Sequence, residues 1–473
     1  MVRIVFTFIF LLTTQMLFAK LSLSSLFTDN MVLQQQKQVP IWGWANKGEK
    51  VTIKTSWDKK TYRTNASTSG NWKIELITPK AGGPYAIEIL AGDKIVLQNV
   101  LIGEVWLCSG QSNMEMPLKG YPGQPIEEST DAIIESKNKN IRFYTVPRNP
   151  SLKLQENSKP SDWKISNPEN SANFSATAYF FAKRLHQILE VPVGVILCAY
   201  GGSNIETWMH QEWLKEVSNL EIPSEENGLK NKNRIPTMLF NGMVNPIVGF
   251  GLKGILWYQG ESNYEIAESY ERLFTGMVQS YRKLWNDDQL PFYYAQIAPF
   301  DYASLPPYHK EDKFNSAFIR DAQRKSLDTL MHSGMVVTLD IGEEECIHPS
   351  KKSEVGDRFA MLALQNSYFL KGINGQSPIY DKYEIHEAQA IVHFRECPLG
   401  LTSHGKELKN FEIAGEDKLF YPANAIIKGK AIVVSSPKVS KPAAVRYGFK
   451  DFVIGDLFGV NGLPVSSFRT DDW

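Results

Sequence analysis

Cysteine is scarce in this sequence. Four occur among 473 residues, widely separated along the chain: Cys108, Cys198, Cys346 and Cys397. Disulfides are found in exported proteins, but wide spacing and apolar surroundings are typical of free, buried thiols. We therefore expect these cysteines to be unpaired.

A charge excess is also missing. The chain has 51 basic and 51 acidic residues, and no run of one sign stands out. A neutral balance argues against nucleic acid or an anionic membrane surface as the main partner. It is compatible with a neutral substrate such as a carbohydrate, although it does not select one.

Long apolar runs are absent after the N-terminus. Residues 1–19 start with Met1-Val2-Arg3, continue through an apolar stretch and end with Leu17-Phe18-Ala19. A basic start, a short apolar core and a small final residue are typical of a secretory signal peptide. The run is too short for a membrane span. We expect its removal to leave a secreted or periplasmic protein with neither a membrane span nor a lipid anchor.

Metal-binding patterns are missing too. His386-Glu387 and His393 do not have the spacing of a His-Glu-x-x-His zinc site, and no other cluster has metal-ligand spacing. We therefore expect no catalytic metal and no cofactor.

The chain does contain clear changes of pattern along its length. Residues 20–98 alternate apolar and polar side chains in short runs between turns, which indicates an N-terminal β-sandwich domain. Residues 99–375 alternate continuous apolar runs with amphipathic stretches, which predicts an α/β domain with a doubly wound parallel sheet. Short alternating runs return in residues 376–473, so we expect a C-terminal β-rich region.

The central sheet is expected to contain five buried strands: Leu101–Cys108, Val193–Cys198, Gly254–Tyr258, Phe292–Ile297 and Met335–Asp340. Helices are expected between or after them: Ala176–Leu189, Tyr270–Trp285 and Glu354–Leu370. Sheets of this kind bind ligands beyond the carboxyl ends of their strands. Polar motifs follow several of these strands, which predicts a functional site at that edge. The polar segment 119–170 is expected to form a long excursion beside the site.

The first of these motifs supplies a candidate nucleophile. Ser112 follows Gly110-Gln111, where the first strand is expected to turn into a helix. A serine hydroxyl needs a base to become a good nucleophile, and His348, before Pro349 at a helix entrance, is the best candidate. The turn lacks the last glycine of the Gly-x-Ser-x-Gly elbow, which disfavours an α/β-hydrolase.

Two further motifs supply candidate hydrogen-bond donors. Backbone N–H groups of Gly201 and Gly202, together with the side-chain amide of Asn263, are candidates for stabilising an oxyanion. Gln259 and Glu261 are candidates for shaping the same site. Each of these residues also has an ordinary explanation in turn or capping chemistry.

The acid that orients the histidine is harder to assign. Glu345 lies three residues before His348 and is our candidate, with Asp340 and the neighbouring glutamates as competitors. A backbone carbonyl could hold the imidazole instead, and the site would then be a Ser-His dyad.

In combination, these motifs resemble the sialate O-acetylesterase family of SGNH hydrolases. The resemblance is carried by four blocks: Gly110-Gln111-Ser112-Asn113-Met114, Gly201 to Trp208, Trp257 to Asn263 and Ile347-His348-Pro349. It also includes Phe240 to Pro246 and the region from Gly462 to Thr470, and it extends over nearly all of the chain after the signal.

The resemblance implies a role for each block. Ser112 would be the nucleophile, His348 the base, and the Ser112 N–H, a glycine of the second block and Asn263 the oxyanion donors. One departure concerns the acid. The family has an acidic residue two or three positions before the histidine, and Cys346 and Glu345 occupy those positions here.

We therefore expect a secreted serine esterase that removes O-acetyl groups from carbohydrates. Sialic acids are the first candidate substrate, and acetylated xylan or another polysaccharide is the alternative. A carbohydrate-binding protein whose hydrolase core has lost activity is a hypothesis of a different class. A lipase or peptidase with the same triad ranks last, because the chain has no long apolar substrate signature.

Overall fold

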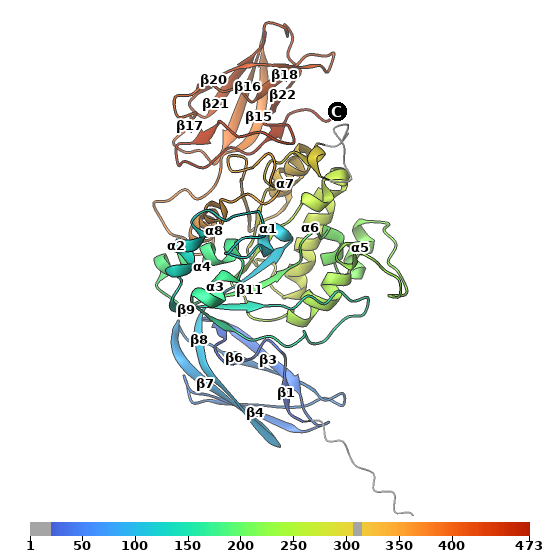
Figure 1. The fold of residues 1–473 in the computed structure, drawn as a ribbon, viewed down its shortest axis with the longest axis vertical. Helices are drawn as coiled ribbons and strands as arrows, with labels where there is room; N and C mark the ends of the chain where they lie inside the picture. The colour runs from blue at the N-terminus through green and yellow to red at the C-terminus, as the bar shows by residue number, and fades with distance from the viewer. Residues whose placement is uncertain (1–19, 306–314) are drawn as a thin grey trace, which may run out of the picture.

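The structure is a computed structural model that describes residues 20–305 and 315–473. Three parts follow one another along the long axis of the molecule: N-terminal strands, a central α/β body and a C-terminal β-rich part (Figure 1). The signal peptide expected in residues 1–19 lies outside the described residues.

The central body contains a parallel sheet with the strand order β9-β11-β8-β12-β13-β14. The strands are β8 (Asp93–Gly110), β9 (Asn138–Thr145), β11 (Val193–Ala199), β12 (Gly254–Tyr258), β13 (Phe292–Ala295) and β14 (Ser333–Val336). The first of these in sequence lies inside the sheet, and later strands extend it on both sides. This arrangement confirms the predicted doubly wound α/β class.

Alternating side chains of the strands build two separate cores. Val105 and Leu107 belong to one buried cluster, while Trp106 and Cys108 belong to the other. Successive strand residues point to opposite faces, so a run that is apolar throughout is buried on both sides. The second cluster contains the helices α4 (Ala176–Leu189) and α8 (Lys352–Asn366), and the first contains α6 (Ala267–Leu284) and α7 (Ala317–Thr329).

Helix α4 has the bounds that the sequence predicted, and Ser175 caps it by accepting a hydrogen bond from Ala178 N at 3.0 Å. Helices α4 and α8 approach closely at Gly356. A Cβ atom there would lie 2.6 Å from Cβ of Phe180, so only glycine fits without displacing α4. This contact fixes the start of α8, which follows His348.

Segment 119–170 is more ordered than the sequence suggested. It contains α2 (Ser129–Ile134), β9, β10 (Lys164–Ser166) and the start of α3 (Pro168–Ala172), and β9 pairs with β11 inside the main sheet. The apolar stretch of β9 is short and contains Arg142, which explains why its pattern did not predict a central strand.

The N-terminal strands are joined to the central sheet by β8 itself. This 18-residue strand crosses the boundary expected at residues 98 and 99, because its first half pairs with β7 and its second half with β11 and β12. The other strands of this part are β1 (Ser22–Leu23), β2 (Val32–Gln34), β3 (Gln38–Trp44), β4 (Lys50–Thr55), β5 (Thr61–Asn65), β6 (Asn71–Ile77) and β7 (Gly82–Ala91).

The C-terminal part contains antiparallel sheets with the orders β15-β16-β21-β20 and β19-β18-β22-β24, and a short pair β17-β23. Their strands are β15 (Ile379–His386), β16 (Gln389–Arg395), β17 (Leu401–Thr402), β18 (Phe411–Ala414), β19 (Phe420–Pro422), β20 (Asn424–Lys428), β21 (Ala431–Ser435), β22 (Ala444–Tyr447), β23 (Phe458–Gly459) and β24 (Phe468–Arg469). The cysteines Cys108, Cys198, Cys346 and Cys397 are free thiols, as expected. Within the described ranges, no helix has the length and apolarity that crossing a membrane requires.

Candidate active site

Ser112 lies at the point where the central strand β8 ends. Gly110, the last residue of β8, has φ +137°, and a Cβ atom at this position would lie 2.1 Å from the carbonyl oxygen of Tyr258. Only glycine can therefore make this turn beside β12. Ser112 is the first residue of α1 (Ser112–Glu115), so its backbone N–H has no acceptor within the helix and is available to a ligand.

His348 meets Ser112 across 236 positions of sequence. The Nε2 atom of His348 is 2.7 Å from Oγ of Ser112, and its Nδ1 atom is 2.6 Å from Oε1 of Gln124. An amide oxygen only accepts hydrogen bonds, so Nδ1 carries the proton and Nε2 is left to accept the serine proton. This is the tautomer that a general base for Ser112 requires.

A tight turn presents Gln124 to the imidazole. Tyr121 and Gln124 exchange backbone hydrogen bonds of 3.0 Å in both directions, and Gly123 has φ +73°. Proline followed by a positive-φ glycine is the sequence signature of a type II turn. The Tyr121 ring packs edge-on against His348 with centroids 5.6 Å apart. The turn therefore both covers the imidazole and supplies its hydrogen-bond partner.

None of the carboxylates expected beside His348 takes that position. Glu345 is exposed, and the ring nitrogen that it was expected to hold is hydrogen bonded to Gln124. The Asp340 carboxylate accepts hydrogen bonds from Arg358 at 2.8 and 2.6 Å. The Glu343 carboxylate accepts one from Ser350 N at 2.7 Å. The geometry thus replaces the expected acid with a neutral amide.

Asn113 ties three of the motifs together beneath the site. Its side-chain amide donates to the Glu261 carboxylate and, at 3.0 Å, to the carbonyl oxygen of Ile347. Its side-chain oxygen accepts a 2.6 Å hydrogen bond from Nζ of Lys352, which also donates to Pro349 O at 2.8 Å. These contacts hold the carbonyl groups on both sides of His348 and thereby fix its backbone.

Burial sets the protonation of this cluster. Burial, reinforced by the charge of Lys352, lowers the pKa of His348 to about 4. Burial also lowers the pKa of Lys352 to about 7, against the opposing effect of Glu261. Burial raises the pKa of Glu261, and the Asn113 amide works in the other direction. His348 is therefore neutral, and ready to accept a proton, throughout the neutral pH range.

Of the expected oxyanion donors, Gly201 and Gly202 line the pocket with Ser112, whereas Asn263 is not among its lining residues. The Gly201 N–H donates to a Glu115 carboxylate oxygen at 2.8 Å. Gly202 has φ +68° and, like Gly201, lines the pocket in front of Ser112. The Asn263 side chain is buried, and its Nδ2 atom donates to Glu206 at 3.0 Å.

Gln259 and Glu261 have distinct places. Gln259 is completely buried, and its amide donates to Ser203 O at 3.1 Å and to Oδ1 of Asn263 at 2.8 Å. It therefore joins the second and third motifs behind the pocket. Glu261 is 4 % exposed and lines the pocket beside Ser112, so it is the one of the two that a ligand can reach.

The pocket in front of Ser112 has a volume of about 440 Å³, within the range of about 300–1,000 Å³ that is usual for small-molecule sites. Arg148 lies on its wall with its guanidinium bound to Glu115 at 2.9 and 2.6 Å. Arg234 also lines the pocket, and its Nε donates to Gly202 O at 3.0 Å. Across residues 20–305 and 315–473, no group of three His, Cys, Asp or Glu side chains is arranged to hold a metal ion.

Sequence reasoning missed two members of the site, Gln124 and Lys352. The Pro-Gly turn before Gln124 was readable, but nothing in the sequence indicated that the turn meets His348. No sequence pattern indicated that Lys352 belongs to the site, because a lysine in the first turn of a helix is ordinarily expected to be solvated. Asn113 was present in the first motif without an assigned role.

Comparisons with known proteins agree with this geometry. Residues 102–365 match the family described as carbohydrate esterase, sialic acid-specific acetylesterase. The chain is 26% identical over 425 residues to the sialate O-acetylesterase of Homo sapiens, and the alignment covers 83% of this chain and 79% of the human one. It is 25% identical over 431 residues to the sialate O-acetylesterase of Mus musculus, and that alignment covers 78% of this chain and 77% of the mouse one.

A solved structure extends the similarity to the whole fold. A carbohydrate acetylesterase from Xanthomonas citri is 33% identical to this chain, with a TM-score of 0.87, and the alignment covers 96% of this chain and 100% of that one. The family match, which spans more than half of the residues, and this structural relative identify a carboxylic ester hydrolase. The chain therefore belongs to the sialic acid-specific acetylesterase family of carbohydrate esterases.

Proposed function

We propose that this protein is an exported serine esterase that removes O-acetyl groups from carbohydrates, with O-acetylated sialic acids as its first substrates. The observation that carries the proposal is the 2.7 Å contact between Ser112 Oγ and His348 Nε2 at the edge of the sheet. The family description and the names of the curated relatives support acetyl esters of sialic acid as the substrate class.

The proposed reaction starts with proton transfer from Ser112 to His348 as the serine oxygen attacks the acetyl carbonyl. The resulting imidazolium keeps its Nδ1–H bond to Gln124. The sugar hydroxyl then leaves with the proton from Nε2, and a water molecule activated by the same nitrogen hydrolyses the acetyl-enzyme. Each step uses one ring nitrogen as the proton carrier and the other as the anchor.

The negative oxygen of the tetrahedral intermediate needs donors. We assign the Ser112 N–H, which starts α1, and the N–H of Gly202 to this role, because the Gly201 N–H already has Glu115 as its acceptor. Asn263 is the third donor in the proposal. Its Nδ2 atom carries two hydrogens, and Glu206 accepts only one of them.

Arginine at the pocket wall supports a substrate that carries a carboxylate. Arg234 is exposed, and its Nε–H donates to Gly202 O. No hydrogen bond joins its terminal nitrogens to another of the described residues, so they can bind a ligand carboxylate. An acetylated neutral polysaccharide is the second candidate, and it is compatible with the similarity to the Xanthomonas citri carbohydrate acetylesterase.

The test compares hydrolysis of 4-nitrophenyl acetate, O-acetylated sialic acid and acetylated xylan by the wild type and by Ser112→Ala. We expect loss of all acetate release in Ser112→Ala and full activity in Ser269→Ala, a serine outside the pocket. Release of acetate by Ser112→Ala at the wild-type rate would overturn the assignment. An Arg234→Gln variant that raises KM only for the sialic acid ester would support sialate as the substrate.

Export is tested separately. A full-length chain expressed in a secreting host is expected outside the cytoplasm with Lys20 as its first residue, because Ala19 ends the signal. An unprocessed N-terminus in the cytoplasmic fraction would contradict this part of the proposal.

A further inference from the structure

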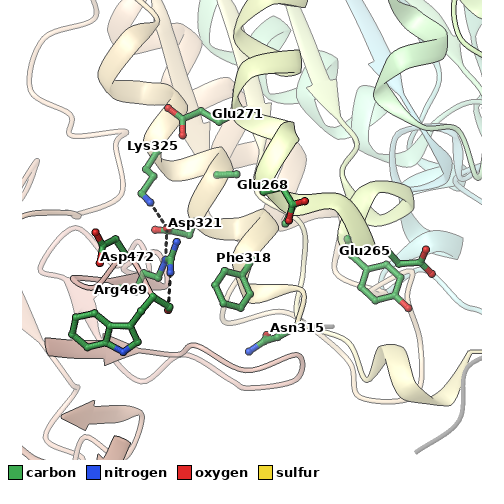
Figure 2. Close-up of a pocket in the computed structure, with 13 residues that line it drawn as sticks. Glu265, Glu268, Glu271, Asn315, Phe318, Asp321, Lys325, Arg469 and Asp472 are labelled. Carbon is green, nitrogen blue, oxygen red and sulfur yellow. Dashed lines mark hydrogen bonds and ion pairs between the residues drawn. The ribbon is translucent and has the colours of Figure 1, made fainter. Parts of the chain in front are cut away.

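A second cavity lies between the central body and the C-terminal part. Its volume is about 520 Å³, and its walls come from α6, α7 and the residues around β24. Figure 2 shows Phe318 and Asn315 at its base, the glutamates of α6 along one side, and Arg469 with Asp472 on the other. The proposed reaction does not use this cavity, and none of the four motif blocks lines it.

The cavity adjoins the catalytic pocket. Tyr264 and Glu265 line both spaces. They belong to the helical turn η5 (Glu261–Ile266), whose first residue faces Ser112, and the next residues of the chain start α6 along the second cavity. A ligand that extends past this shared wall would therefore occupy both spaces at once.

Three aromatic side chains line the second cavity: Tyr264, which it shares with the catalytic pocket, and Phe318 and Trp473, which it does not. Phe318 is half-buried, and the Arg469 guanidinium lies 4.9 Å from its ring centroid. The Phe449 ring makes a T-shaped contact with it, with centroids 5.0 Å apart. Trp473 is 38% exposed, and its ring has the Lys418 ammonium at 4.9 Å. Rings held in this way offer apolar surface of the kind that the C–H faces of a sugar ring cover.

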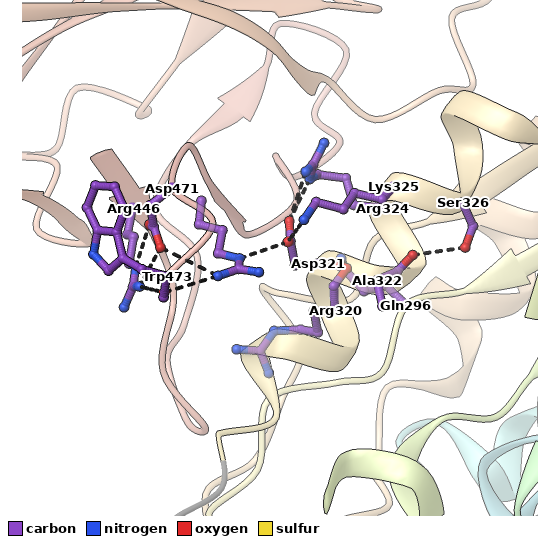
Figure 3. Close-up of polar contacts among 11 residues, drawn as sticks. Gln296, Arg320, Asp321, Ala322, Arg324, Lys325, Ser326, Arg446, Asp471 and Trp473 are labelled. Atoms are coloured by element: carbon purple, nitrogen blue, oxygen red, sulfur yellow. Dashed lines mark hydrogen bonds and ion pairs between the residues drawn. The ribbon is translucent and has the colours of Figure 1, made fainter. Parts of the chain in front are cut away.

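A polar network holds Trp473 in place (Figure 3). Asp471 accepts hydrogen bonds from Arg446 at 2.8 and 2.7 Å, and Arg446 and Arg469 both donate to the carbonyl oxygen of Trp473, at 3.2 and 3.3 Å. Arg469 also binds Asp321 of α7 at 3.2 Å. The network joins the C-terminal part to α7, so the cavity is built from fixed elements and is preorganised for a ligand.

The charge of the cavity selects among sugars. Five acidic and two basic side chains line it, which gives a formal charge of −3. The two basic residues, Lys325 and Arg469, both pair with Asp321 at 2.9 and 3.2 Å. The remaining carboxylates have no ion pair among the described residues: Glu265, Glu268, Glu271 and Asp472. Carboxylates accept hydrogen bonds from sugar hydroxyls and repel a second anion.

We propose that this cavity is a subsite for uncharged sugar residues of the glycan chain whose acetylated residue is bound at Ser112. The inference rests on the proposed function, because only a carbohydrate ester would place its chain beyond Tyr264 and Glu265. Phe318 and Trp473 supply the apolar contacts, and the free carboxylates accept hydroxyl hydrogen bonds and exclude acidic sugars.

The test compares esters with and without a neutral chain. The two matched pairs are O-acetylated sialic acid against O-acetylated sialyllactose, and acetylated xylose against acetylated xylotetraose. For the acetylated sugar that the enzyme accepts, we expect the chain to raise kcat/KM by about tenfold, equivalent to about 1.4 kcal/mol. Trp473→Ala and Phe318→Ala should abolish this gain and leave 4-nitrophenyl acetate hydrolysis unchanged.

Controls separate the subsite from general effects. Phe369 is 78% exposed and lies outside the cavity, so Phe369→Ala should keep the full chain effect. Trp473→Ala guards against a folding defect in Phe318→Ala, because Trp473 is the more exposed ring. A kcat/KM that does not depend on the chain, or a chain effect that survives both variants, would overturn the subsite.

Failure of the proposed function gives a different result. If no acetyl ester is hydrolysed, binding of unacetylated lactose and xylotetraose to the wild type is measured by calorimetry, and its absence would overturn the subsite as well.

The charge of the cavity is tested with acetylated xylo-oligosaccharides that carry glucuronic acid. The wild type should discriminate against them, and Glu268→Lys should reduce that discrimination severalfold, whereas unchanged discrimination would contradict the charge argument.

Discussion

Replacing Gln124 by glutamate tests the neutral partner of the proposed base. The two side chains have the same shape, so the 2.6 Å contact with Nδ1 of His348 is kept while a negative charge is added. In the wild type, burial and the charge of Lys352 both lower the pKa of His348, and together they hold it at about 4. A carboxylate in the same place favours the imidazolium and opposes both effects.

The size of the effect follows from the contact. An opposite charge within about 4–6 Å shifts a pKa by about 1–3, so Gln124→Glu should move the pKa of His348 from about 4 to between about 5 and 7. A shift of one pKa unit corresponds to about 1.4 kcal/mol of added stabilisation of the protonated ring relative to the neutral one. The imidazolium that forms in the transition state gains from the same interaction, so kcat/KM at pH 8 should rise by about tenfold or more.

The assay is the pH dependence of kcat/KM for 4-nitrophenyl acetate, which reports the ionisation of the free enzyme. The wild type should stay active down to an acid limb near pH 4, and in Gln124→Glu this limb should lie at least one unit higher. Glu345→Gln is the matched control. Because Glu345 is exposed and does not hold the ring, its profile should coincide with that of the wild type. An unmoved limb in Gln124→Glu, or a moved one in Glu345→Gln, would refute the reasoning.

Three further predictions concern stability and the oxyanion. Because the pKa of His348 is about 4 in the folded chain against an ordinary 6.5, the unfolded chain takes up the proton first as the pH falls. The free energy of unfolding should therefore decrease by about 3 kcal/mol between pH 6.5 and 4 because of His348. In urea unfolding of His348→Gln, the decrease over the same pH range should be smaller by this amount. Asn263→Ala should lower kcat by about 10²–10³ with little change in KM, and an unchanged kcat would remove it from the oxyanion site. Burial raises the pKa of Asp321, but Arg324 and Lys325 outweigh it and hold the pKa below its ordinary value. Asp321→Asn should therefore cost about 3 kcal/mol in thermal or urea unfolding, because it leaves buried cations without their partner.

Much of the fold could be predicted because its causes are local. Strands such as Gly254–Tyr258 are apolar throughout, since both faces of a parallel strand are covered by helices, and this pattern is visible in a single sequence. Helix α4 was predicted with its observed bounds because its capping serine and its apolar spacing agree. Strand β9 was missed for the opposite reason, since its apolar stretch is brief and interrupted by Arg142.

Only those features of the site that follow from the sheet topology could be predicted. A parallel sheet brings the ends of β8, β11 and β12 to one edge, so Ser112, Gly201 and Asn263 could be placed together. The partner of His348 depended instead on a turn at Tyr121–Gln124, which reaches the ring across 224 positions. The sequence favoured Glu345 because it is near in the chain, whereas distance in the chain says nothing about which side chain a folded turn presents.

The amide residues of the motifs explain why four short blocks are enough to build one site. An amide side chain donates and accepts at the same time, so it can join two groups that a carboxylate or a hydrocarbon cannot. Gln111 accepts from the backbone of Ser262 at 3.2 Å, Asn113 bonds Ile347 O and Lys352, and Gln259 bonds Asn263 and Ser203 O. These bonds are buried or partly buried, and an unpaired polar group is costly there, so each motif is held in register only when the others are present. The positions of Ser112 and His348 are therefore a property of the amide network, and substitutions in it should act on catalysis through misplacement of these two side chains.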